Sequence, residues 1–81
     1  MNLTVRLFAA ARERAGVGEA VVDLPIGATV ADVQAALAEA CPALGPLLPS
    51  CLFAVNAEYA AEGRVVCEGD ELALIPPVSG G

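Results

Sequence analysis

The sequence predicts a single α+β domain in which one main helix packs across one face of a mixed sheet of four or five strands. Alternating apolar and polar residues, typical of half-buried strands, occur near the start of the chain and again before residue 25. Residues 30–40 have apolar side chains at helical spacing. One substantial helix cannot cover both faces of a sheet, so a doubly wound fold is excluded. A chain of 81 residues makes one domain.

The first two elements follow from residues 2–16. Residues 2–8, NLTVRLF, alternate and predict a half-buried strand. Its inward-facing side chains are Leu3, Val5 and Leu7. The following AAARERAG is rich in helix formers and ends in Gly16, which predicts a short helix or helical turn.

The next two elements are a strand and the main helix. Residues 19–24, EAVVDL, alternate again and predict a second strand, with Ala20, Val22 and Leu24 facing inward. Thr29 is a candidate N-cap because Asp32, three residues later, can meet the exposed N–H groups of the first turn. The helix is expected to end near Ala40, because Pro42 cannot continue it. Its buried stripe is expected to comprise Val30, Val33, Leu37 and Cys41.

The second half of the chain predicts a proline-rich loop and three more strands. The loop covers residues 42–50, and LFAVN at 52–56 predicts a third strand. A short strand is expected at 64–67, between two turns. The last strand, ELALIP at 71–76, is almost entirely apolar, as expected where both faces of a sheet are covered. If it lies centrally, the C-terminal residues leave from the interior of the sheet.

Composition disfavours several classes of partner. The formal net charge is −6 and the chain has no lysine, so nucleic acid and anionic membranes are poor partners, and a basic protein surface is a better one. A hydrophobic content of 57% predicts an apolar surface patch in addition to a core. The N-terminus lacks a secretory signal pattern. The odd number of cysteines, Cys41, Cys51 and Cys67, therefore predicts reduced thiols in a cytoplasmic protein.

The last six residues, 76–81, predict an extended tail on a domain of residues 1–75. Pro76 and Pro77 restrict the backbone to an extended arm. The next two residues, Val78 and Ser79, offer an apolar anchor and a hydrogen-bonding group. The final pair, Gly80 and Gly81, has no Cβ, which lets the backbone enter a narrow channel. A functional tail is therefore favoured over an inert one.

The reacting group of such a tail is the α-carboxylate of Gly81. A carboxylate is a poor electrophile, so we expect another enzyme to adenylate it with ATP before a sulfur or nitrogen nucleophile displaces AMP. This chain has no histidine and no phosphate-binding glycine loop, because the glycines of GVGEAV lead into a strand. We expect a carrier that is not an enzyme by itself and binds no cofactor.

Three segments resemble a known family: LFAAARERAG at 7–16, VNAEY at 55–59 and GDELALIPPVSGG at 69–81. They closely resemble the small, sulfur-carrier subunit of molybdopterin synthase, and the resemblance covers essentially the whole chain. It implies a ubiquitin-like β-grasp fold, which fits the predicted order of elements.

The resemblance also implies a reaction and its partners. An E1-like enzyme would adenylate Gly81, and a sulfur donor protein would supply the sulfur of a thiocarboxylate. The large synthase subunit would take up the tail, in a heterotetramer of two small and two large subunits. The sulfur would then pass to cyclic pyranopterin monophosphate in molybdenum-cofactor biosynthesis.

Matching the family by position gives a set of partner-binding residues. An apolar face of the sheet would dock on the large subunit. Family members often have an aromatic residue where this chain has Ile75. The docking residues would be Phe8, Tyr59 and Ile75, and the tail residues that enter the partner would be Pro76, Pro77, Val78, Ser79 and Gly80.

Other interpretations of the same sequence stay open. The chain could carry sulfur for thiamine thiazole or another thiolation pathway, although thiazole carriers are typically shorter in the region of residues 41–50. It could be a ubiquitin-like protein conjugated to lysines, or a β-grasp binding module with an inert tail. The absence of lysine excludes conjugate chains built on itself.

Several residues have a structural as well as a functional interpretation. The cysteines could shuttle sulfur, but thiols of the core or loops are the default. Phe8 and Tyr59 could belong to the core. An acidic group around Arg64 is either a solvated surface or a docking site for a basic partner. The acidic residues are Glu58, Glu62, Glu68, Asp70 and Glu71.

Overall fold

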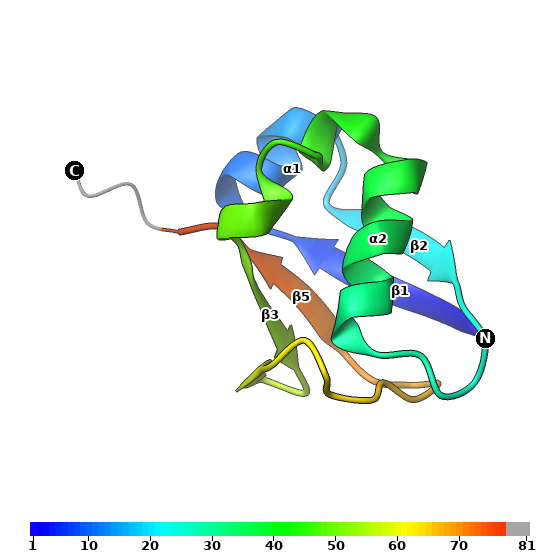
Figure 1. The fold of residues 1–81 in the computed structure, drawn as a ribbon. Helices are drawn as coiled ribbons and strands as arrows, with labels where there is room; N and C mark the ends of the chain where they lie inside the picture. The colour runs from blue at the N-terminus through cyan, green and yellow to red at the C-terminus, as the bar shows by residue number, and fades with distance from the viewer. Residues whose placement is uncertain (78–81) are drawn as a thin grey trace.

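A five-stranded sheet and a helix that crosses one of its faces form most of the structure, a computed structural model that describes residues 1–77 (Figure 1). The strands are β1 (Asn2–Leu7), β2 (Glu19–Asp23), β3 (Leu52–Val55), β4 (Glu58–Ala60) and β5 (Leu72–Ile75). The helices are α1 (Ala9–Ala15) and α2 (Val30–Ala40), with two short 3₁₀ helices, η1 (Pro42–Leu44) and η2 (Leu48–Ser50). Within residues 1–77, none of the helices is long and apolar enough to cross a membrane.

The strands are arranged in the order β2-β1-β5-β3-β4. Strands β1 and β5 are parallel, with Leu7 opposite Leu74, and the other neighbours are antiparallel. The apolar last strand therefore lies at the centre of the sheet, as the sequence predicts. The sheet is mixed and one main helix covers one face of it, which confirms the predicted α+β class.

Helix α2 begins at the predicted N-cap. The Thr29 hydroxyl accepts a hydrogen bond from the Asp32 N–H at 3.4 Å, and the Asp32 carboxylate accepts one from the Thr29 N–H at 2.8 Å, a reciprocal capping box. Two further N–H groups, of Val30 and Ala31, donate to carbonyls of the 61–66 segment. The first turn is thus fully hydrogen-bonded. The predicted stripe packs on the sheet, since Val30, Val33 and Leu37 are buried and Cys41 is half-buried.

The prediction of a short strand at 64–67 is wrong. Only an isolated bridge forms there, between Val65 and Thr29. The segment instead runs along the start of α2, where the Arg64 carbonyl accepts from Val30 and the Val66 N–H donates to Ala28, each at 2.9 Å. The fourth strand is β4, in a segment that the sequence analysis treats as a turn.

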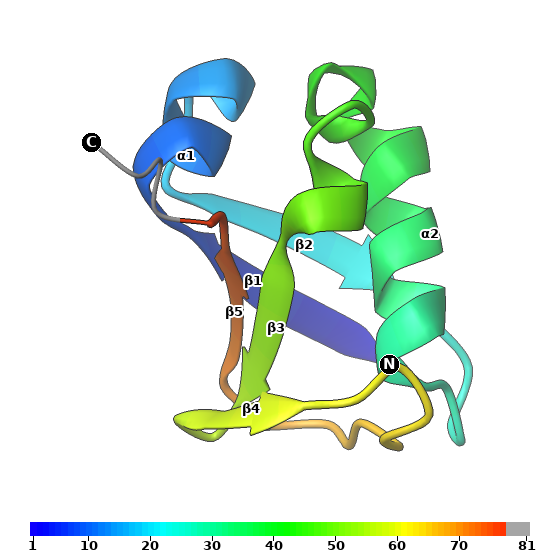
Figure 2. The same ribbon diagram turned by 60° about the vertical axis from the view of Figure 1, so that its left-hand side comes forward.

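The proline-rich segment contributes to the core. Its two 3₁₀ helices bury Leu44 and Leu48 almost completely. The segment lies at the same end of the sheet as α1, which contacts η1 (Figure 2). It extends the layer formed by α2, and no helix within residues 1–77 crosses the other face of the sheet.

Candidate docking face and tail root

The uncovered face of the sheet is formed by alternate residues of the strands. Strand register places Arg6 opposite Ala73 and Ala73 opposite Ala54, and Ala54 is in turn opposite Tyr59. Residues opposite one another share a face. Because the intervening Leu72 and Leu74 are buried beneath the helix layer, this row points away from α2.

Apolar side chains gather on the half of this face formed by β3, β4 and β5. Leu52 lies opposite Ile75 and is 56% exposed, while Tyr59 is 69% exposed. Phe8 follows the last residue of β1 and is 41% exposed, with the Arg6 guanidinium carbon 5.4 Å from its ring centre. We define the docking face as Phe8, Leu52, Ala54, Tyr59, Ala73 and Ile75.

The structure brings three predicted site residues, Phe8, Tyr59 and Ile75, onto one surface. Phe8 and Tyr59 are exposed, so neither is a core residue. Ile75 is half-buried between them. The sequence analysis missed Leu52, which the strand alternation could have identified, because its neighbour Phe53 belongs to the core.

The tail begins at the end of the central strand. Pro76 is buried and Pro77 is exposed, so the first proline packs against the domain and the second leads away from it. We call these two prolines the tail root. Because β1 and β5 are parallel, their ends lie side by side and the tail leaves next to Phe8. The predicted tail residues Val78, Ser79, Gly80 and Gly81 lie outside the described residues.

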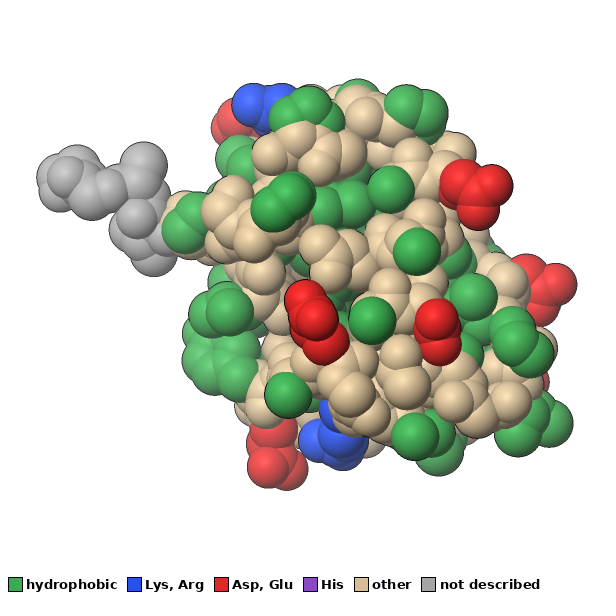
Figure 3. Space-filling model, viewed as in Figure 1, with side chains coloured by type: hydrophobic (Ala, Val, Ile, Leu, Met, Phe, Trp, Pro, Cys, Tyr) green, Lys and Arg blue, Asp and Glu red, His purple; other side chains and the backbone are tan. Residues whose placement is uncertain are grey.

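Charged groups are distributed unevenly over the molecule. A hollow of about 210 Å³ beside the tail root is lined by Arg6, Arg12 and Glu19. Figure 3 shows acidic side chains spread over the face that carries α2, with basic ones only near its margins. Among residues 1–77 the only ion pair joins the Met1 ammonium to Asp23, at 3.3 Å. Within residues 1–77, Arg64 therefore forms no ion pair with the predicted acidic group.

One member of that acidic group has a defined structural role. The Asp70 carboxylate accepts hydrogen bonds from the Cys67 N–H at 2.7 Å and from the Asn56 side-chain amide at 3.0 Å. The Asn56 side-chain oxygen accepts from the Glu71 N–H at 3.0 Å. The backbone bond to Cys67 and then the bond to Asn56 lower the pKa of Asp70. We call these three hydrogen bonds among Asn56, Cys67, Asp70 and Glu71 the clip. The clip joins the β3–β4 turn to the turn before β5.

The three thiols are separate and unpaired. Cys41 and Cys51 are half-buried and Cys67 is exposed. Burial raises the pKa of the Cys51 thiol, whose S–H donates to the Leu47 carbonyl at 3.3 Å. Within residues 1–77 no three histidine, cysteine or acidic side chains are grouped to hold a metal ion.

Comparison with known sequences and structures gives consistent matches over the whole chain. The profile of the ThiS family matches residues 5–81. A molybdopterin synthase sulfur carrier subunit of Chlamydomonas reinhardtii is 42% identical, with 100% of both chains covered. Small archaeal modifier protein 1 of Haloferax volcanii is 44% identical over 94% of this chain and 97% of its own. A crystal structure of that modifier superimposes with a TM-score of 0.89 at 39% identity, covering 100% of both chains.

Proposed function

Because this chain belongs to the ThiS family of ubiquitin-like β-grasp proteins, we propose that it is the sulfur-carrier subunit of a molybdopterin synthase. The full-length match to sulfur carrier subunits supports the carrier role. On this proposal the isolated chain catalyses nothing and binds no cofactor, because its own Gly81 carboxylate is the group that reacts.

The proposed reaction has three steps, all in partner proteins. An E1-like enzyme transfers AMP from ATP to the Gly81 carboxylate and releases pyrophosphate. A sulfur donor protein then supplies sulfur at the sulfide level, which attacks the activated carbonyl and displaces AMP, and a thiocarboxylate forms. In the large synthase subunit that sulfur passes to cyclic pyranopterin monophosphate, and water supplies the oxygen that restores the Gly81 carboxylate for another cycle.

The observation that carries this proposal is the position of the tail root beside the docking face. Pro76 is buried at the end of the central strand, and Phe8 and Ile75 lie next to it. A partner that covers the exposed Leu52 and Tyr59 is therefore in place to receive the tail. Apolar patches of this kind mark protein–protein contact sites.

Intact mass tests the reaction directly. After incubation with an E1-like enzyme, ATP and a sulfur donor, the mass of the chain should rise by the difference between one sulfur and one oxygen atom. Omitting ATP should abolish the rise, because the carboxylate must first be adenylated. An unchanged mass in the complete mixture would remove every carrier function.

Deletion of Gly81 tests the position of the reacting group. This variant should lose sulfur transfer and pterin conversion while its thermal unfolding stays nearly unchanged, because the deletion removes no residue of the five strands or of the buried core. Glu39→Gln, at an exposed position of α2, is the matched control and should transfer sulfur normally. Pterin conversion that survives the deletion contradicts the proposal.

A second candidate is supported by the modifier relative from Haloferax volcanii, which is named for protein modification. In that function the activated Gly81 carboxylate would form an amide with an amine of another protein. The two functions separate in one experiment. A modifier yields products heavier by the whole chain less one water, whereas a synthase subunit yields the thiocarboxylate and co-purifies with a large subunit.

A further inference from the structure

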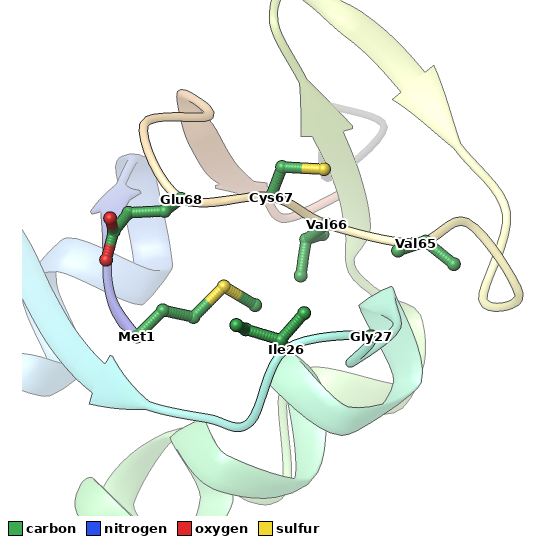
Figure 4. A pocket seen from close by; sticks show the side chains of 7 residues that line it. All are labelled: Met1, Ile26, Gly27, Val65, Val66, Cys67 and Glu68. Carbon is green, nitrogen blue, oxygen red and sulfur yellow. The ribbon is translucent and has the colours of Figure 1, made fainter.

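A second apolar surface lies around a hollow of about 450 Å³, within the size range of sites that bind small molecules or buried side chains. The side chains of Met1, Ile26 and Val66 converge on it, and Val65 and Glu68 border it (Figure 4). Its lining is mainly apolar. Ile26 is 93% exposed and Val65 51%, so large β-branched side chains surround the opening without covering it.

The walls of the hollow are held by hydrogen bonds from three separate segments. The Met1 ammonium donates to the Leu24 carbonyl at 2.7 Å, and the Leu24 N–H donates to the Met1 carbonyl at 3.0 Å. The Val66 N–H donates to Ala28, and the Cys67 N–H to Asp70. The hollow is therefore formed in the unbound chain, so a ligand would not have to order it.

The hollow and the tail root lie at opposite ends of the molecule. Met1 precedes the start of β1, whereas Phe8 and the tail root lie at the other end of β1 and β5 (Figure 1). A protein that holds the docking face and the tail leaves the hollow open. A ligand of the hollow can therefore stay bound while the tail is inside an enzyme.

The charges at the hollow indicate which ligand it would accept. Among residues 1–77, Glu68 is the one charged side chain that lines the hollow, and the Met1 ammonium is paired with Asp23 at 3.3 Å. A second copy of this chain would bring another Glu68 and a further net charge of −6 to the same place. Charge therefore favours a basic partner over self-association.

We propose that this hollow binds a large apolar side chain of a partner protein, in a segment that carries a lysine or arginine beside it. An aromatic side chain fits best, because the Met1 thioether makes favourable contacts with aromatic rings and adapts to their shape. The neighbouring cation would meet the Glu68 carboxylate. This site extends the proposed function without depending on it, since it uses neither Gly81 nor the docking face.

The test is a titration of the isotope-labelled full chain with capped peptides, followed by NMR. The probes are a peptide with one phenylalanine between two lysines, its counterpart with two glutamates, and one with alanine in place of phenylalanine. The lysine–phenylalanine peptide should shift the amide signals of Gly27 and of residues 65–68. It should bind at least about threefold more tightly than the glutamate peptide, the effect of an exposed ion pair.

Two variants and a matched control make the result specific. Ile26→Ser should weaken binding about fivefold by removing apolar contact, and Glu68→Gln should remove the preference for lysine over glutamate. Val21→Ser, an exposed apolar position of β2, should leave binding unchanged. Three outcomes would each overturn the proposal. They are amide signal shifts confined to the docking face, no amide signal shifts at about 5 mM peptide, and self-association of the chain through Ile26. None of these outcomes bears on sulfur transfer.

Discussion

Two residues with positive φ shape the turn between β3 and β4. Asn56 and Ala57 have φ angles of 51° and 68°, and Val55 is opposite Glu58, as in a two-residue type I′ hairpin. Asparagine tolerates this conformation, whereas the Cβ of Ala57 makes it unfavourable by about 1 kcal/mol. Asn-Gly is the usual hairpin signal at these positions. Its absence explains why sequence patterns alone did not identify β4.

Ala57→Gly should therefore stabilise the protein. The expected gain in the free energy of unfolding is about 0.5–1 kcal/mol, because glycine relieves the left-handed conformation but loses more entropy on folding. Denaturant unfolding measures it. Ala35→Gly, at an exposed position inside α2, is the control and should destabilise by about 1 kcal/mol. Equal loss of stability in both variants would contradict the turn assignment.

The thiols should differ in reactivity according to their surroundings. We expect iodoacetamide to alkylate the exposed Cys67 first and Cys51 most slowly, because burial raises the pKa of Cys51 and its thiol donates to Leu47. Peptide mass mapping over time gives the order. Rapid modification of Cys51 near neutral pH would mean that its thiol becomes exposed to solvent. That result would favour a sulfur-shuttle role for Cys51.

At the level of elements, local sequence patterns predicted the secondary-structure elements whose stabilising contacts are also local in the sequence. The capping box of Thr29 and Asp32 and the apolar stripe of α2 both follow from spacing along the chain. The segment at 64–67 has the composition of a strand, but its N–H and carbonyl groups bond to the start of α2. The choice of that partner depends on the folded arrangement, so periodicity could not predict it.

The clip formed by Asp70 should make stability depend on pH. Hydrogen bonds lower its pKa in the folded state, so the unfolded chain binds more protons in acid. The contribution is fully present above about pH 4 and is lost as pH falls through the folded-state pKa. Urea unfolding from about pH 6 to pH 2.5 measures this effect. The free energy of unfolding should decrease less over this range in Asp70→Asn than in the parent chain.

A neighbouring carboxylate serves as the control for this measurement. Glu68 accepts no hydrogen bond within residues 1–77, so Glu68→Gln should keep the parent's pH dependence. If Asp70→Asn and Glu68→Gln changed the acid limb equally, general charge repulsion and not the clip would explain it.

For the whole molecule, the fold was more predictable than the site. The central position of β5 followed from its apolar run, and the predicted docking residues Phe8, Tyr59 and Ile75 came from a family resemblance. Strand alternation could have placed Leu52 on the same face, but its position opposite Ile75 comes from the strand register. The hollow around Ile26 was not predicted, because its walls come from segments distant in sequence.

The docking face should contribute to binding of a large synthase subunit. Leu52→Ser and Tyr59→Ser should each weaken that binding about tenfold, because each removes a large, exposed apolar contact from the docking face. Calorimetric titration measures the affinity, and thermal unfolding should hardly change. Val21→Ser, equally exposed but on β2, is the matched control. Normal binding by both docking-face variants would place the interface elsewhere.

The parallel pairing of β1 with β5 also has a mechanical consequence. The chain enters the sheet at one end of β1 and leaves it at the opposite end of β5, so traction between the two termini loads their shared hydrogen bonds together, in shear. Unzipping those bonds one at a time would need a different direction of force. Force applied to the end of β5 while β1 is held is therefore resisted by all of their shared hydrogen bonds at once.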